Sequence, residues 1–418
     1  MTEPSRVPAW LPLAAVSLLG AALRVWGLWD QPPSSDDIAV AVSAWSYLDT
    51  GHLGPTMWNH PPLRNVLVGS SLALFGSNVW GLKLVSLLLG VLAVPLLGVV
   101  AWQLFRSPEI ATVAALFLAV DALHIDYSRQ AVQEVYMMCF TLGGLAAALR
   151  FLERRRARWI GLAGLCFGLG LASKWYVAFP LVVTCAWVVV QLGRSGPEDS
   201  SRALPDLLLA LLALTALPTV VYLLSFGPWF LRGYDLSEWL TLHRLMYLET
   251  TTHGGYNPAD LEIDRSAWLW FVKPVAYADF LFTEGHPRVL LGVSNPLVWM
   301  GTLPAMAYAA VRGLRERSVP LLFLVTLFAL PYAALLATDR PIWAHTAFAV
   351  LPFALCAVAF SAWELARARR NGRKELAVYL CLVLLVSAPL YLLATGRGMN
   401  NPLLRPIIEG YEPSYDWE

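Results

Sequence analysis

Two adjacent carboxylates, Asp36 and Asp37, stand between two long apolar runs, where a carboxylate could serve as a general base on a hydroxyl group. Ser34, three residues before Asp37, predicts a helix start with a capping box. Acids in the first turn of a helix also offset its dipole, which requires no catalytic role. Apolar residues then recur at helical spacing, so we expect this helix to lie on a membrane surface and to hold both acids near the headgroups.

Cations and a further acid follow in the next short polar segments. His60 and Arg64 flank a Pro-Pro-Leu turn, Arg129 precedes Glu134 by five residues, and Lys174 lies in a turn between two apolar runs. Cations can hold and neutralise a phosphate leaving group. The plainer alternative is that Arg129 and Lys174 extend toward lipid headgroups. Together with the carboxylates, these residues could catalyse the transfer of a group from a lipid-linked phosphate.

The elements that must position these residues are membrane helices. The chain has 418 residues, of which 57% are hydrophobic and 14% charged, against about 25% charged in soluble domains. A span needs about 20 apolar residues, with some tolerance in length, and about eleven runs are candidates, some of them short: Ala9–Leu28, Val79–Phe105, Ile110–Leu123, Ala131–Phe151, Ile160–Ala172, Trp175–Leu192, Leu204–Phe226, Pro296–Val311, Val319–Ala337, Ala344–Trp363 and Leu376–Ala394. The sequence therefore predicts an all-α polytopic membrane protein, with Leu63–Phe75 as a half-buried surface helix.

Arginine-rich loops alternate with loops that contain few arginines. The former include residues 150–158, 312–317 and 367–374, and the positive-inside rule places them in the cytoplasm together with the N-terminus. The acids and cations described above then face the extracytoplasmic side. The first helix has no small-residue cleavage site, so we expect it to be retained. The excess of Arg over Lys suggests a GC-rich bacterial source, hence an inner (plasma) membrane protein.

Motifs for several other kinds of site are missing. No Walker loop and no Gly-x-Gly-x-x-Gly fingerprint is present, so no nucleotide needs to bind from the cytoplasm, and the net charge of +1 gives no reason to expect nucleic acid. All five Cys lie inside apolar runs, which predicts neither disulfides nor a metal centre.

We expect three parts along the chain: a catalytic transmembrane module over 1–226 with a first outer loop at 29–78, a long extracytoplasmic loop over 227–295, and a C-terminal four-helix segment with an outer tail over 296–418. Within the long loop, Leu236–Tyr247 has the pattern of an amphipathic surface helix, and Thr250–Gly255 that of a mobile turn. We predict that this aromatic-rich loop forms the outer wall of the site and selects the acceptor.

The order of these motifs resembles the protein O-mannosyltransferases, which belong to the C-type membrane glycosyltransferases that use polyprenyl-phosphate sugars. Asp36-Asp37 corresponds to the family's Asp-Glu, and the His60 turn to its His-Pro-Pro. The run ending in Lys174-Trp175 resembles its Gly-rich run, and Glu134 stands where Asp is usual. Further likeness is found at Trp239–Tyr277, Asn295-Pro296 and Arg340-Pro341. The carbohydrate-binding module that the eukaryotic enzymes insert is absent from residues 227–295.

The resemblance implies an inverting transfer, most simply of mannose, from a polyprenyl-phosphate sugar to a Ser or Thr hydroxyl of a secreted or membrane protein. Asp36 would deprotonate the acceptor. The implied site consists of catalytic Asp36, Asp37 and Glu134, and of donor-phosphate-binding Arg129, Lys174, His60 and Arg64. We expect no cofactor and no metal, although Asp36, Asp37 and His60 could bind a divalent ion.

Two alternatives stay open. The same donor chemistry could act on a lipid or a cell-wall glycan, with a different acceptor pocket in residues 227–295. A transporter of lipid-linked sugars would instead place polar groups at mid-helix depth. The long spans carry almost no charge, and the acids lie at their rim, which favours an enzyme.

Overall fold

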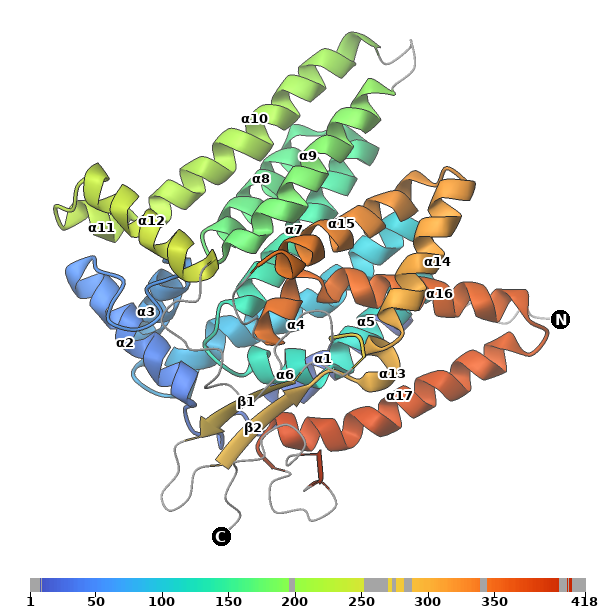
Figure 1. The fold of residues 1–418 in the computed structure, drawn as a ribbon, viewed down its shortest axis with the longest axis horizontal. Helices are drawn as coiled ribbons and strands as arrows, with labels where there is room; N and C mark the ends of the chain where they lie inside the picture. The colour runs from blue at the N-terminus through green and yellow to red at the C-terminus, as the bar shows by residue number, and fades with distance from the viewer. Residues whose placement is uncertain are drawn as a thin grey trace.

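The computed structural model describes residues 8, 10–194, 200–251, 270–272, 276–281, 288–338, 344–397, 404 and 406–407. Long helices run side by side, and a small sheet lies at one end of the molecule (Figure 1). The helices, with η marking a short 3₁₀ helix, are α1 (Leu11–Val25), α2 (Ser35–Thr50), α3 (Leu63–Phe75), α4 (Val79–Phe105), α5 (Pro108–Val120), α6 (Ala122–Ser128), α7 (Glu134–Arg154), α8 (Ala157–Leu171), η1 (Trp175–Val177), α9 (Ala178–Gly193), α10 (Ser200–Ser225), α11 (Gly227–Leu231), α12 (Leu236–Thr251), α13 (Pro296–Trp299), α14 (Thr302–Arg315), α15 (Val319–Leu336), η5 (Ala344–Ala349), α16 (Leu351–Ala368) and α17 (Gly372–Ala394).

Helices occupy all eleven ranges for which a span is predicted, and α3 and α4 have the predicted bounds. Within the described ranges, seven helices are long and apolar enough to cross a membrane, or eight if the bent pair α5 and α6 forms one span. The helices α1, α3 and α8 are apolar but shorter. A multi-pass helical membrane protein is therefore confirmed, while the count of about eleven spans stays a prediction.

Close helix packing depends on small residues in α8. A Cβ atom on Gly164 would lie 2.0 Å from the carbonyl oxygen of Ala213, and one on Gly168 would lie 2.7 Å from Cβ of Val221. Both contacts are with α10, and the two glycines are one helical turn apart. This spacing lets two apolar helices approach closely, as small-xxx-small motifs do in membranes.

Two buried arginines donate hydrogen bonds to the last carbonyl groups of neighbouring helices. Arg24 on α1 donates to the carbonyl oxygens of Leu118 (2.9 Å) and Ala119 (3.0 Å), where α5 ends and the chain bends by 63° into α6. In return, Arg129 after α6 donates to the carbonyl oxygens of Arg24 (3.0 Å) and Trp26 (2.8 Å) at the end of α1. The last carbonyls of a helix have no partner within it, so Arg24 caps α5 and Arg129 caps α1.

The long outer loop contains a β-hairpin that an all-α interpretation did not predict. Strands β1 (Ala276–Leu281) and β2 (Arg288–Val293) are antiparallel, and Asp279 pairs with Leu290. Val289, Leu291 and Val293 pack in a hydrophobic cluster with residues of α6 and α17, and an isolated bridge joins Leu281 to Ser34. The hairpin thus links the start of α2 to the C-terminal helices.

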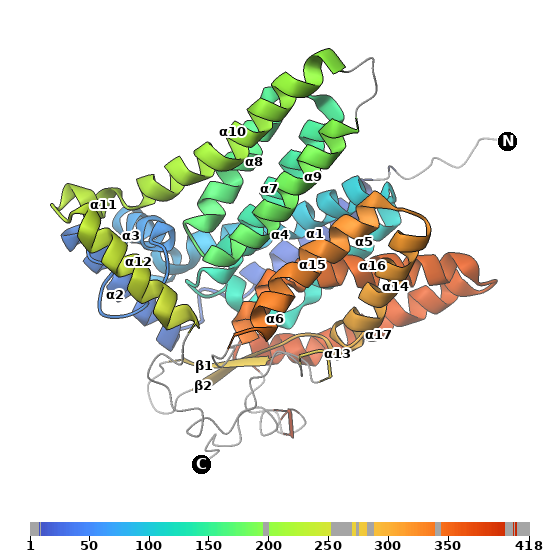
Figure 2. The same cartoon turned by 45° about the horizontal axis from the view of Figure 1, so that its top comes forward.

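The predicted surface helix over Leu236–Tyr247 is present as α12. It lies beside α2 and α11 at the same end of the molecule as the hairpin (Figure 2). Residues 252–255 of the predicted mobile turn, and Arg340-Pro341, fall outside the part of the chain that the structure describes.

Candidate active site

The two neighbouring acids at the start of α2 have different surroundings. Asp37 is fully buried and forms the predicted capping box with Ser34, since its carboxylate accepts from the Ser34 backbone N–H at 3.0 Å. It also accepts from the backbone N–H of Ala131 at 2.7 Å and forms a buried ion pair with Nζ of Lys83 at 2.8 Å. Asp37 therefore fastens α2 to α4 and to the segment before α7.

Asp36 is only half-buried. Its backbone N–H donates to Oδ2 of Asp279 on β1 at 3.5 Å, and the hydroxyl of the preceding Ser35 donates to the other oxygen of the same carboxylate. Asp36 also lies close enough to Arg64 to stabilise the charged guanidinium. Of the two acids, Asp36 is the one whose position allows an acceptor to reach it.

Lys174 and Glu134 form a second buried ion pair, at 2.6 Å. The turn that carries Lys174 is joined to the His-Pro-Pro-Leu turn, because the backbone N–H of Leu63 donates to the carbonyl oxygen of Ala172 at 3.0 Å. Two motifs that are about 110 residues apart in the sequence are therefore adjacent.

Arg64 completes this group of charges. It is 1% exposed and donates to Oδ1 of Asn65 at 2.9 Å and to the side chain of Gln133, next to Glu134. Burial lowers its pKa to about 10, while Glu134, Tyr136 and Asp36 favour the charged form. Arg64 therefore keeps its positive charge at neutral pH between the two groups of acids.

The other two predicted donor-binding residues are Arg129 and His60. The guanidinium of Arg129 is buried, and it donates to Oε1 of Gln31 (2.8 Å) and to three backbone carbonyls at the end of α1. It thus holds the segment that leads into α2. His60 is half-buried in the turn before α3.

Two acids that the sequence analysis did not assign to the site lie beside α2. Asp279, on β1, accepts from Ser35 and Asp36. Asp126, on α6, is fully buried and accepts from Nε2 of Gln130 at 2.7 Å, and a Cβ atom at Gly292 would lie 2.7 Å from its other oxygen. Neither Asp279 nor Asp126 lies in a local motif that would assign it to the site from the sequence.

Aromatic residues form a wall next to the Lys174 turn. Nε1 of Trp175 donates to Oη of Tyr222 at 3.0 Å, and that hydroxyl lies 2.7 Å from Nε2 of His243 on α12. Nδ1 of His243 is 2.8 Å from the carbonyl oxygen of Trp239. A carbonyl only accepts, so Nδ1 carries the proton and Nε2 accepts from Tyr222. This chain of hydrogen bonds joins α12 to the site.

The arrangement of these charged residues favours a site for group transfer over a purely structural role in stabilising the fold. A half-buried carboxylate can take a proton from a hydroxyl. Two buried cations, Arg64 and Lys174, lie on the neighbouring elements and can compensate charge that develops on a phosphate. In the described part of the chain, no group of three or more His, Cys, Asp or Glu residues has the arrangement of a metal site.

Comparison with known proteins finds similarity to membrane glycosyltransferases. Residues 53–232 match the family model of dolichyl-phosphate-mannose-protein mannosyltransferases. The polyprenol-phosphate-mannose–protein mannosyltransferase of Mycolicibacterium smegmatis is 24% identical, over 95% of this chain and 91% of the relative. An undecaprenyl phosphate-alpha-4-amino-4-deoxy-L-arabinose arabinosyl transferase of Pseudomonas aeruginosa is 25% identical, over 73% of this chain and 51% of the relative.

Among solved structures, the S. cerevisiae protein O-mannosyltransferase Pmt1-Pmt2 complex bound to its sugar donor matches with a TM-score of 0.78 and 11% identity, over 94% of this chain and 91% of that chain. At that identity the match shows the fold. The predicted C-type glycosyltransferase fold and the predicted family resemblance are both confirmed.

Proposed function

We propose, from the chain's relationship to the dolichyl-phosphate-mannose-protein mannosyltransferases, that it transfers mannose from a polyprenyl-phosphate donor to a Ser or Thr hydroxyl of a protein. The transfer inverts the anomeric carbon and takes place on the extracytoplasmic side, with the Arg-rich loops in the cytoplasm. The relatives' names support the sugar, the donor and the acceptor.

In the proposed step, the carboxylate of Asp36 takes the proton of the acceptor hydroxyl. The hydroxyl oxygen forms a bond to the anomeric carbon as the bond from that carbon to the phosphate oxygen breaks. The polyprenyl phosphate leaves with the electron pair, and Lys174 and Arg64 compensate its charge. This step needs no metal ion, so we expect activity to withstand a chelator.

We assign Asp36 as the general base because its surroundings differ from those of Asp37. The buried carboxylate of Asp37 is held by three partners, namely the ammonium of Lys83 and the backbone N–H groups of Ser34 and Ala131. Asp36 is more exposed and lies beside Arg64. A base must meet its acceptor, so we assign proton transfer to Asp36 and a positioning role to Asp37.

For the donor phosphate, Lys174 and Arg64 are the more direct candidates. Glu134 holds the ammonium of Lys174 at 2.6 Å and would share it with an incoming phosphate. Arg129 already donates four hydrogen bonds around the end of α1, so we assign it the task of holding the segment before α2. His60 would contact the donor from the turn before α3.

The test is a transfer assay with polyprenyl-phosphate mannose and a Ser/Thr-containing peptide, using Asp36→Asn and Asp37→Asn in the full chain. Asp36→Asn keeps the shape and removes the basicity, so we expect the rate to fall by about 100-fold or more, the scale of general-base loss. Nuclear magnetic resonance of the product should show inversion. Full activity in Asp36→Asn would refute the assignment.

A second function, transfer to a lipid or glycan acceptor, is favoured by one observation: the Pseudomonas aeruginosa relative is named for another sugar and not for a protein acceptor. Membranes supplied with labelled donor would separate the two functions. Label in the protein fraction supports the first proposal, and label confined to lipid or glycan supports the second.

A further inference from the structure

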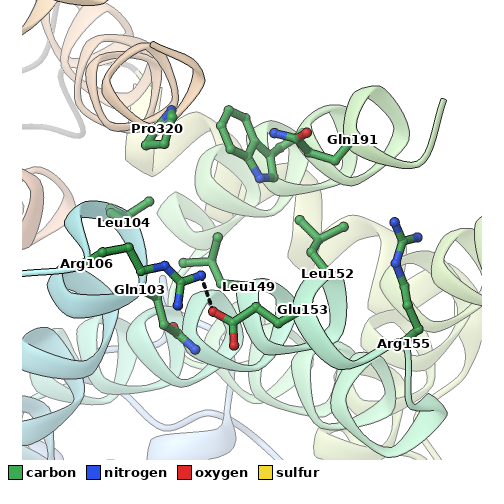
Figure 3. A pocket seen from close by; sticks show the side chains of 10 residues that line it. Gln103, Leu104, Arg106, Leu149, Leu152, Glu153, Arg155, Gln191 and Pro320 are labelled. Carbon is green, nitrogen blue, oxygen red and sulfur yellow. Dashed lines mark ion pairs between the residues drawn. The ribbon is translucent and has the colours of Figure 1, made fainter. Parts of the chain in front are cut away.

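A cavity of about 340 Å³ lies at the other end of the long helices, away from Asp36. Its walls come from the ends of α4 and α7, from α9 and from the start of α15 (Figure 3). Lys83, which pairs with Asp37, and Phe105 lie at opposite ends of α4, 22 residues apart, which corresponds to about 33 Å along a helix. The cavity is therefore about one bilayer thickness from the candidate active site.

Two buried polar atoms in this wall have neither a hydrogen-bond partner nor an ion-pair partner among the described residues. One is Oε1 of Gln103, whose side chain is 7% exposed and whose Nε2 donates to the carbonyl oxygen of Ala146 at 3.0 Å. The other is Nε1 of Trp187, whose ring stacks on Phe323. A carbonyl oxygen only accepts and an indole N–H only donates. A buried polar group without a partner is costly, so this wall is suited to a ligand that both donates and accepts.

The cavity also carries net positive charge. Arg106 and Arg150 both pair with Glu153, and Arg155 lies 3.7 Å from Asp206. Of the residues that line the cavity, the guanidinium groups of Arg106 and Arg155 against the carboxylate of Glu153 leave one positive charge. Leu104, Leu149, Leu152 and Pro320 provide an apolar side to the same space.

We propose that this cavity binds the headgroup of an anionic phospholipid whose phosphodiester carries a hydroxyl-bearing group. The phosphate accepts from Nε1 of Trp187 and from the arginines, a headgroup hydroxyl donates to Oε1 of Gln103, and the leucines contact the start of the acyl chains. A volume of this size is within the usual range for small-molecule sites. No bond is made or broken, and the site is separate from the Asp36 group.

The experiment uses the purified full chain in nanodiscs that contain phosphatidylcholine and phosphatidylglycerol, with the retained lipids measured by mass spectrometry. We expect phosphatidylglycerol to be enriched on the wild type. Trp187→Phe keeps the ring stacking and removes the N–H, and Arg155→Ala removes one charge. Each should lower the enrichment by about three- to tenfold, the scale of one hydrogen bond.

Arg154→Ala is the matched control, because Arg154 is the exposed neighbour of Arg155 and does not line the cavity. It should leave the enrichment unchanged, and all variants should keep the wild-type melting temperature and transfer activity. No enrichment on the wild type, or an equal loss in Arg154→Ala, would overturn the proposal. Displacement of the lipid by soluble glycerol phosphate at equal concentration would assign the cavity to a free phosphate ester and overturn the lipid assignment.

Discussion

At the residue scale, the buried pair of Asp37 and Lys83 supports the acid that we assign to catalysis. Removing one partner of a buried ion pair leaves an uncompensated charge and costs about 3–5 kcal/mol. We predict such a loss for Lys83→Met, measured as the free energy of unfolding in detergent. Lys83→Met combined with Asp37→Leu should recover a large part of it. A double variant as unstable as the sum of the two single variants would contradict this prediction.

Lys174 offers a test of donor binding. Lys174→Met should raise the Michaelis constant for the polyprenyl-phosphate donor by about tenfold or more and leave that for the acceptor peptide unchanged, because a charge-assisted hydrogen bond to phosphate is lost. Glu134→Gln is the matched control, since it keeps the ammonium and removes its competing carboxylate. A rise in the acceptor constant alone in Lys174→Met would place this lysine on the acceptor side.

Asp279 is predicted to be a positioning residue. Its carboxylate accepts from Ser35 and Asp36 and so fixes the first turn of α2. Asp279→Ala should lower kcat by about tenfold, the scale of one or two lost hydrogen bonds, with both Michaelis constants unchanged. Asp279→Asn, which can still accept, should restore most of the rate. If Asp279→Asn is as impaired as Asp279→Ala, the negative charge matters and the role is not positioning alone.

At the scale of elements, the contact of α12 with the site depends on a neutral histidine. Burial lowers the pKa of His243 below its ordinary value, so the fold favours the unprotonated ring. In the unfolded chain the ring takes a proton near pH 6.5. The stability contributed by this contact is therefore complete above about pH 6.5 and is lost as pH falls toward the lower pKa of the folded state.

We predict that the melting temperature of the wild type falls as pH is lowered from 7.5 to 5.5, and that His243→Gln flattens part of this fall. Glutamine can still hydrogen-bond to Tyr222 and does not titrate. The difference between the two curves is the measurement. Parallel curves would show that the decrease arises elsewhere.

The helices could be predicted from the sequence because a membrane span needs a long apolar run, which is visible without any knowledge of contacts. The hairpin could not, since β1 and β2 are short and their pairing is set by packing on α6 and α17. The same limit applies to Asp279, which lies 243 residues from Asp36. The sequence predicts a role for both Asp36 and Asp37, but only the structure shows that Asp37 is held in an ion pair by Lys83.

At the scale of the whole molecule, the three predicted parts of the chain interlock. The hairpin from the long loop bridges to Ser34 in the first part and packs against α17 in the third. Exchanging residues 227–295 for those of a relative with another acceptor should therefore shift acceptor preference, and it should also slow transfer, because β1 contributes Asp279. Donor preference should stay unchanged in a competition assay. A change in donor preference would assign this loop to the lipid-phosphate side.

The capping of α5 by Arg24 and of α1 by Arg129 has a consequence for how the chain is made. Arg24 enters the membrane with α1, yet its partner Ser128 follows 104 residues later. Ribosomes add about 5–20 residues per second, so α1 waits roughly 5–20 s for that partner. Arg24 lies in the last turn of α1, where an arginine costs less at insertion than the about 2.5–3.5 kcal/mol of a helix centre. Until α6 has been made, Arg24 lacks its hydrogen bond to Ser128, so α1 reaches its final packing only after these later residues are in place.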